Sequence, residues 1–251
     1  MLAAMTNDLS AGSLFTDTIF VESADKLDAE YQLNTGVRTR SSNKKYNLDE
    51  LKNSLQDDFQ DMMNEEPQNI EKDLQNPVPR TRATTTFFTE NDRYLMRRYQ
   101  DNWWNSFNSS YANFSGAFGG DCTNYASQVI NASNAPQYAY SKDGIYGSTY
   151  WYYRTASNRS TSWTAAEELR YFLKNNGTKG PVGYTSSTYG ALDSGDIIFL
   201  LDNNRKAYHA VVVYLKDGDP HVTAHTSAYS GKFSVRYGGI TNEKIRIAGY
   251  Y

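Results

Sequence analysis

Cysteine is almost absent from this sequence, with one residue, Cys122, in a chain of 251. A single cysteine excludes an internal disulfide framework, so the fold must depend on a packed core. Long apolar runs are also lacking, because no stretch approaches the roughly 20 residues that a helix needs to cross a bilayer. We therefore expect no membrane insertion. Histidine is scarce as well: the three histidines are His209, His221 and His225.

A leader segment is not recognisable either. The first residues, MLAAMTNDLSAGS, lack the basic flank and the long apolar centre of a secretory signal peptide. Two interpretations follow: a cytoplasmic protein, or a secreted protein whose signal has been removed. The shortage of cysteine is compatible with a secreted bacterial protein that has no structural disulfides.

Charge and aromatic content divide the chain near position 90. Residues 1–90 carry 16 acidic and 9 basic side chains, whereas residues 91–251 carry 12 acidic and 16 basic ones. The stretch QNPVPRTRATTTFF (75–88) separates the two parts, and its prolines exclude a continuous helix. We predict an acidic N-terminal extension and linker over 1–88 and a compact domain over 89–251. The two charged parts are either ordinary solvated surfaces, or the extension packs against the domain as an inhibitory or docking segment.

Within the predicted domain, helices come first and strands come last. Hydrophobic periodicity and capping residues predict helices at 89–107, from 122 onward and at 164–177, the last with a capping box at Thr164 and Glu167. Alternating patterns then predict strands at 195–201, 207–215, 221–227, 232–238 and 244–251. This order indicates an α+β fold with N-terminal helices packed on an antiparallel sheet. In the extension, 13–23 is typical of a strand and 47–63 of an amphipathic helix.

The cysteine lies where a glycine turn becomes a helix, in AFGGDCTNYASQVINA (117–132). Asp121 is an acceptable N-cap residue, which makes Cys122 the first helical residue. The unsatisfied amides and the positive end of the helix dipole favour a thiolate there, and the thiolate is the nucleophilic form. The alternative interpretation is a buried cysteine that acts only as a small hydrophobic side chain.

The histidines lie on two adjacent predicted strands joined by the turn KDGDP (216–220). If Val213 pairs with His221, antiparallel pairing places His209 opposite His225. A slip of one residue places Thr226 there instead, and a slip of two places Ser227 there. This geometry nominates His209 as a general base and His225 as the group that orients its ring, the generalised nucleophile–base–orienter arrangement. A zinc site formed by Cys122, His209 and His225 is a competing interpretation, although no CxxC or HxxxH spacing supports it.

The segment GGDCTNYASQ closely resembles the sequence around the nucleophile of the putative amidase domain family, a branch of the papain-like NlpC and CHAP peptidases. NWWNSF before the cysteine, SGDIIFL, YHAVVVY and VTAHTS resemble further parts of this superfamily in the same order. The resemblance covers roughly residues 90–251 and implies a papain-like half-barrel fold. Many members have Trp or Asp before the catalytic histidine, where this chain has Tyr208, which would keep an aromatic wall beside the base.

The resemblance implies a cysteine amidase or peptidase that acts by acyl transfer on a bacterial cell-wall peptide or a related amide. Cys122 would attack the carbonyl, His209 would move the proton, and His225 would fix the tautomer of His209. Asp121 would support the site as an N-cap or hydrogen-bond acceptor. No metal or organic cofactor is needed. The protein would then be extracellular or associated with the cell wall, and a catalytically inactive binding module of the same fold is the alternative.

The tyrosine-rich stretch YAYSKDGIYGSTYWYYRT (138–155) has two interpretations of equal weight. Its aromatic rings would form a wall of a substrate groove, because they stack well on sugar and peptide planes, or they would pack only against one another. Nucleic-acid binding is not expected, since the domain has no dense stripe of Lys and Arg.

Overall fold

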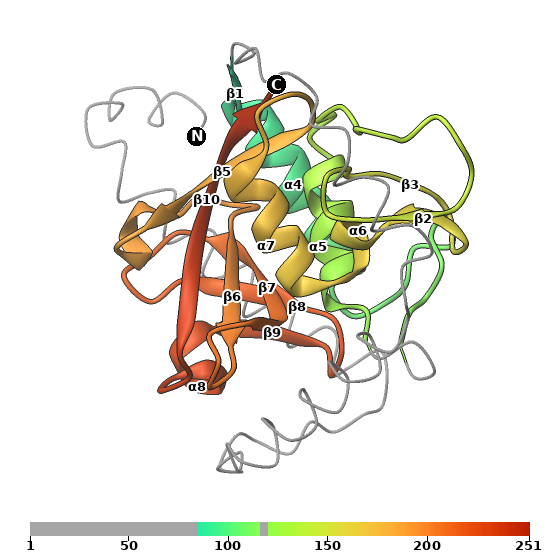
Figure 1. Cartoon of the computed structure of the whole chain (residues 1–251). Coiled ribbons are helices and arrows are strands. Elements are labelled where there is room, and N and C mark those ends of the chain that lie inside the picture. Colours follow the sequence, from blue (N-terminus) through green and yellow to red (C-terminus); the bar gives the residue numbers. More distant parts are fainter. Residues whose placement is uncertain (1–84, 116–119) are drawn as a thin grey trace, which may run out of the picture. The chain divides into compact units, whose positions relative to one another are not determined.

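The computed structural model describes residues 85–115 and 120–251 (Figure 1). The strand expected at 13–23 and the helix expected at 47–63 lie outside the described residues, as does the extension over 1–88 apart from its last four residues. The boundary between extension and domain therefore stays a prediction. No helix in the described ranges combines the length and apolar character needed to cross a membrane.

The described residues form a mixed α+β structure whose main sheet is antiparallel. Seven strands make this sheet, in the order β1-β10-β6-β7-β8-β9, and β5 pairs with β10 beside that path. Its strands are β1 (Thr86–Phe87), β5 (Pro181–Ser186), β6 (Ile197–Leu201), β7 (Ala207–Leu215), β8 (His221–Ala224), β9 (Tyr229–Lys232) and β10 (Asn242–Tyr250). A small second sheet joins β2 (Ile145–Tyr146), β4 (Asn158–Ser160) and β3 (Tyr153–Thr155).

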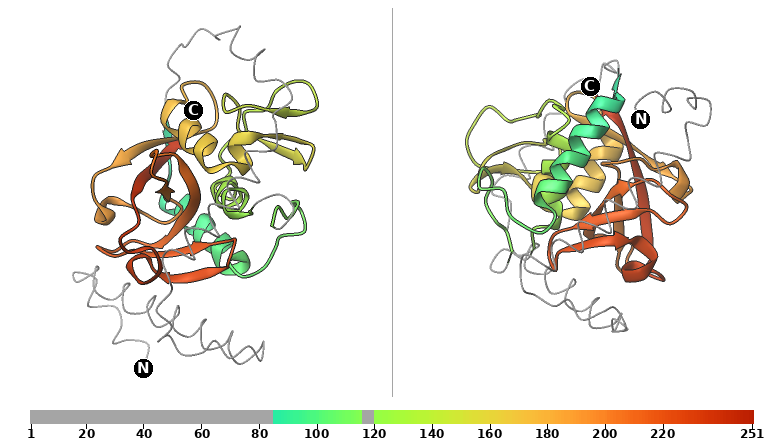
Figure 2. Two further views of the ribbon diagram at one scale, coloured as in Figure 1. Left: turned by 60° about the horizontal axis from the view of Figure 1, so that its bottom comes forward. Right: turned by 180° about the vertical axis from the view of Figure 1, so that it is seen from behind.

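The three longest helices cover one face of the main sheet, and a short helix near the C-terminus packs on the other face (Figure 2). The helices are α4 (Glu90–Trp103), α5 (Cys122–Asn131), the short α6 (Thr161–Thr164), α7 (Ala166–Asn175), the 3-10 turn η1 (Tyr189–Ala191) and α8 (Phe233–Tyr237). The helix-side core is formed by α5, α7 and the facing strand residues, among them Tyr125, Val129, Leu169, Phe199, Ala210, Val212 and Ile245. The opposite core contains residues of the other face and of α8, among them Ile198, Leu200, Val211, Val213, Phe233 and Tyr237.

The three long helices α4, α5 and α7 precede strands β5 to β10 as predicted, but β1 to β4 come before or between these helices, and several boundaries differ from the prediction. The first helix ends at Trp103 rather than 107, because Asn and Ser side chains after it bond the local backbone instead, as in the bond from the Ser110 N–H to Asn108 Oδ1 (2.9 Å). The predicted capping box at Thr164 is wrong. Thr164 belongs to α6 and its Oγ1 accepts from Arg159 Nε (3.2 Å), so the following helix starts at Ala166 without a side-chain cap.

The strand predicted at 232–238 is also wrong, because Phe233–Tyr237 forms helix α8. The letters FSVRY alternate, but Phe233 and Tyr237 are also four residues apart, so one turn of helix places both in the opposite core. Asp219 caps this turn, since it accepts from the Ser234 backbone N–H (3.0 Å) and from Ser234 Oγ (2.6 Å).

The register between β7 and β8 is shifted by one residue from the pairing of Val213 with His221. Val213 pairs with Val222, and the register is irregular between Val213 and Leu215. The shift matters because neighbouring strand residues point to opposite faces of a sheet. Continued past the end of β8, this register would place Thr226 opposite His209, and β8 itself ends at Ala224. Thr226 and Ser227 follow in the left-handed region, with φ of 57° and 59°.

The motif SGD before β6 fixes the start of this strand against helix α4. Gly195 has φ of +87°, and a Cβ there would lie 2.0 Å from Met96 Sδ, so only glycine fits. Asp196 is fully buried and forms an ion pair with Arg93 of α4 (Oδ1 to Nη1, 2.7 Å). Its carboxylate also accepts from the backbone N–H of Ile247 (2.9 Å). Burial raises the pKa of Asp196 to about 6, and the neighbouring Arg93 opposes that shift.

Replacement of Arg93 by methionine is expected to lower the free energy of unfolding by about 3–5 kcal/mol, because it leaves the Asp196 carboxylate buried without its cation. Urea denaturation followed by circular dichroism measures the effect. Arg98→Met is the matched control, since Arg98 is exposed on the same helix and its loss should change stability by less than about 0.5 kcal/mol. Equal effects of the two substitutions would contradict the assignment.

Candidate active site

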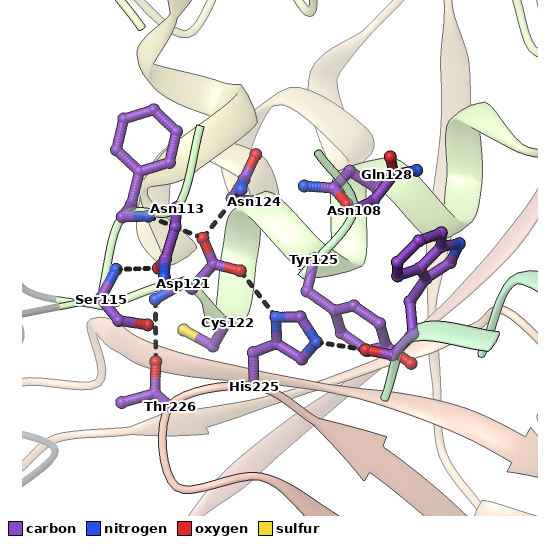
Figure 3. A network of polar contacts seen from close by, with 12 residues as sticks. Asn108, Asn113, Ser115, Asp121, Cys122, Asn124, Tyr125, Gln128, His225 and Thr226 are labelled. Carbon is purple, nitrogen blue, oxygen red and sulfur yellow. Dashed lines mark hydrogen bonds and ion pairs between the residues drawn. The ribbon is translucent and has the colours of Figure 1, made fainter. Parts of the chain in front are cut away.

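The sole cysteine is the first residue of α5 and lies among polar side chains (Figure 3). Cys122 is 2% exposed. Its Sγ is 3.6 Å from Thr123 Oγ1, and Cys122 directly follows Asp121 in the chain. The cysteine is therefore buried at a helix start with charged and polar neighbours, and not within hydrocarbon alone.

Asp121, just before the cysteine, holds three elements together through its carboxylate. Oδ1 accepts from the backbone N–H of Phe114 (2.9 Å) and from Asn124 Nδ2 (2.8 Å). Oδ2 faces Nδ1 of His225 at 2.6 Å. The backbone N–H of Asp121 donates to Thr226 Oγ1 (2.8 Å). Asp121 is the N-cap residue of α5 by position, but its side chain makes no capping hydrogen bond.

His225 connects the end of one helix to the start of another. Its Nδ1 contacts Asp121, and its Nε2 contacts the backbone carbonyl of Trp103 at 2.6 Å, at the end of α4. Both partners accept hydrogen bonds, and only a ring with a proton on each nitrogen can donate to both. The ring also stacks on Tyr125 (centroids 4.1 Å apart, 16° between planes) and meets Phe107 edge-on at 5.1 Å.

Tyr125 is fixed by a chain of buried hydrogen bonds across the helix-side core. The Tyr125 hydroxyl is 2.9 Å from Thr223 Oγ1 on β8. The Thr223 hydroxyl in turn donates to Gln100 Oε1 of α4 at 2.6 Å. Burial raises the pKa of Tyr125, so the phenol stays neutral. The stacking partner of His225 is therefore rigidly placed.

Three further polar side chains of CTNYASQ have structural partners that no local sequence pattern predicts. Almost all of α5 is buried, so each polar side chain on it needs a partner. Asn124 Oδ1 accepts from Trp163 Nε1 (2.9 Å), Ser127 Oγ from Trp151 Nε1 (3.2 Å) and Gln128 Oε1 from the Tyr99 hydroxyl (2.5 Å). Polar residues inside an otherwise apolar helical pattern are the sequence signal for such a network.

His209 lies on the opposite face of the sheet. It pairs in register with Leu200, which belongs to the opposite core, and its ring centroid is 6.0 Å from that of Tyr237. His209 is 1% exposed, and its Nε2 has no hydrogen-bond partner among the described residues. Burial lowers the pKa of His209 to about 3, and the charge of Arg236 lowers it further, so the ring is neutral.

The expected contact between the two histidine rings is therefore not formed. His225 stacks on Tyr125 in the helix-side core, and its two nitrogens bond Asp121 and Trp103 instead of His209. Tyr237 lies close to both His209 and Cys122. Burial raises the pKa of Tyr237, Arg236 opposes that rise, and a negative charge on the cysteine would add to it. Cys122 is thus within electrostatic reach of the phenol that packs beside His209.

The residues singled out in the sequence also include Tyr208, Ser227 and His221. Tyr208 is the extra residue in the irregular pairing of β6 with β7, and its hydroxyl is buried without a partner among the described residues. Burial raises the pKa of Tyr208 to about 12. Ser227 is exposed in the turn after His225. His221 is half-buried on β8, in register with Leu215.

A metal centre is not assembled in the part of the chain that the structure describes. No group of three His, Cys, Asp or Glu side chains there is arranged to hold a metal ion. The zinc site weighed from the sequence would need His209 and His225 together, and they lie on opposite faces of the sheet.

Comparison with known proteins adds a family and one relative. The family model described as a putative amidase domain matches residues 90–248. An uncharacterized protein of Bacillus subtilis (strain 168), YhbB, is 30% identical over 138 residues, which cover 54% of this chain and 41% of that protein. The match thus spans about two fifths of the relative's length. No solved structure matches the chain.

Proposed function

Because the chain belongs to the putative amidase domain family, which indicates hydrolysis of amide bonds, we propose that it is a cysteine-dependent amidase that acts by acyl transfer. The observation that carries the proposal is the position of Cys122, the sole cysteine, at the N-terminus of a buried helix. Amide dipoles at such a position stabilise a thiolate.

The proposed reaction forms a thioester and then hydrolyses it. A general base takes the thiol proton of Cys122, and the thiolate attacks the amide carbonyl. The C–N bond then breaks, and the base gives the proton to the departing amine. Water then attacks the thioester, which releases the acid and returns the proton to sulfur. The backbone N–H groups at the start of α5 are the proposed donors to the oxyanion.

His209 is the proposed general base, and the hydrogen-bond partners of the His209 and His225 rings support this choice. A base needs a nitrogen lone pair, and both nitrogens of His225 already face acceptors. His209 is neutral, and its Nε2 is not engaged by a described residue. A thiolate nearby would stabilise the imidazolium that forms during the reaction and so offset the cost of its burial.

The proposed substrate is an amide in a bacterial cell-wall peptide, and the proposed location is extracellular or at the cell wall. The helices followed by a sheet, with the cysteine at a helix start, support a papain-like fold of the NlpC and CHAP type. Tyr138, Tyr140 and Tyr150 form a cluster with Tyr146, with the Tyr140 and Tyr146 rings 4.3 Å apart. The three half-buried members offer aromatic surface for a sugar or peptide plane, although the rings also pack on one another. Digestion of purified muropeptides with product analysis identifies the bond cleaved.

A catalytically inactive binding module is the second candidate function. The near-complete burial of Cys122 and His209 favours it, since a substrate must reach the sulfur of an active enzyme.

The pH dependence of alkylation separates the two candidates. Iodoacetamide treatment between pH 5 and 9, followed by mass spectrometry, measures the modification rate of Cys122. An amidase should show a thiol that reacts well below pH 8, because an ordinary cysteine has a pKa of about 8.5. A thiol that reacts only above about pH 8, or not at all in the folded protein, would favour the binding module.

A further inference from the structure

The side chain of Asp121 is not used as a helix cap. An aspartate at the N-cap ordinarily accepts hydrogen bonds from backbone N–H groups of the first turn. Here its two oxygens bond Phe114 N–H, Asn124 Nδ2 and His225 instead, and no capping bond is formed. The carboxylate is therefore directed away from the amides beside Cys122.

His225 is held in the orientation that keeps the carboxylate there. Its second nitrogen is 2.6 Å from the Trp103 carbonyl, one of the carbonyls that the end of a helix leaves without an intrahelical partner. Tyr125 stacks on one face of the ring, and Phe107 meets it edge-on. A rotation of the ring would break both hydrogen bonds, and Asp121 and His225 are only 1% and 3% exposed, so water does not readily replace them.

Without His225, the carboxylate would need another donor for Oδ2. The nearest donors in an N-cap geometry are the first-turn amides of α5. A capping carboxylate would take up these amides and direct its negative charge at the first turn of α5, and both effects disfavour a thiolate.

We propose that His225 is a positioning residue that holds the Asp121 carboxylate away from the first turn of α5, so that the amide dipoles there act on Cys122. This inference rests on the proposed role of Cys122 as the nucleophile. It assigns His225 a task at the nucleophile, in place of the expected task of orienting His209.

The test is the iodoacetamide alkylation rate of Cys122 at pH 7 in four full-length proteins: the wild type, His225→Leu, the double variant Asp121→Ala/His225→Leu, and His221→Leu. We expect His225→Leu to lower the rate about tenfold, and the double variant to recover to within about threefold of the wild type, because it has no carboxylate to occupy the amides. His221→Leu controls for the loss of a histidine from the same strand segment and should leave the rate unchanged.

The inference is overturned if the double variant reacts no faster than His225→Leu, since a merely structural role would make the two losses add. An unchanged rate in His225→Leu would overturn it as well. Circular dichroism checks folding. If His225→Leu does not fold, His225→Gln replaces it: the glutamine amide can donate to Asp121, so a rate within about threefold of the wild type supports the inference and a loss beyond tenfold refutes it. The ratio between variants tests this inference, whereas the pH profile of the wild type tests the proposed function.

Discussion

Cys122→Ala is expected to abolish amide hydrolysis, with a loss of at least a thousandfold, on the order of what removal of a catalytic nucleophile costs other acyl-transfer enzymes. The chain contains no other cysteine that could replace it. Cys122→Ser should also lose most of the rate, because a serine hydroxyl is far less ionised than a thiol. Release of new amino groups from muropeptides, followed with an amine-reactive dye, measures the rate.

Thermal unfolding of the same variants provides the control. Cys122 is buried beside Asp121 and Thr123, so alanine removes little volume and should leave the protein folded. An alanine variant that is folded and retains more than about a tenth of the wild-type rate would mean that another group carries the reaction.

His209→Leu is expected to remove activity and, at the same time, to make the protein less sensitive to acid. Burial lowers the pKa of His209 from 6.5 to about 3, with Arg236 acting in the same direction. Between these pH values the unfolded chain binds a proton that the folded protein does not bind. The free energy of unfolding therefore falls as the pH drops, by up to about 1.4 kcal/mol per pH unit from this residue. As the proposed base, His209 should also contribute at least about a hundredfold to the rate.

Urea denaturation at pH 7.5 and pH 4.5 measures the stability effect. The contribution of His209 is fully present above pH 6.5 and is lost as the pH falls toward 3, so the wild type should lose more stability than His209→Leu between the two pH values. Burial raises the pKa of Asp196. Burial acts in the same direction on Glu243, but its hydrogen bonds with Lys174, Thr185 and Arg170 outweigh that effect and lower its pKa. Both groups are present in both proteins, so they cancel in the comparison. An identical loss in the two proteins would contradict the buried, neutral assignment of His209.

Strands β6, β7 and β10 were the easiest elements to predict because their signal is local. Strand β7 spans the predicted range of 207–215, since every residue in it except His209 is apolar or aromatic. Helix α5 begins at Cys122 as expected, because two glycines and an aspartate precede a run of residues with helical spacing. Helix α8 was missed, since Phe233 and Tyr237 fit both periods and the capping Asp219 lies outside the segment.

The site depended on contacts that no local pattern contains. The pairing of Asp121 with His225 joins residues 104 positions apart. The register of β7 and β8 differs by one residue from the expected pairing, so its continuation places Thr226 rather than His225 opposite His209. The sequence therefore identified the residue types of the site but not their partners. The same holds for Asp196 in the SGD motif, which meets Arg93 from a helix far earlier in the chain.

The most direct test of a cysteine mechanism compares residual activity with the extent of alkylation in the wild-type protein. Because Cys122 is the only thiol, the intact mass of each sample gives the fraction of molecules modified by iodoacetamide. The proposed mechanism predicts that amide hydrolysis falls in proportion to this fraction and vanishes at complete modification. A fully alkylated protein that hydrolyses its substrate at the unmodified rate would contradict it.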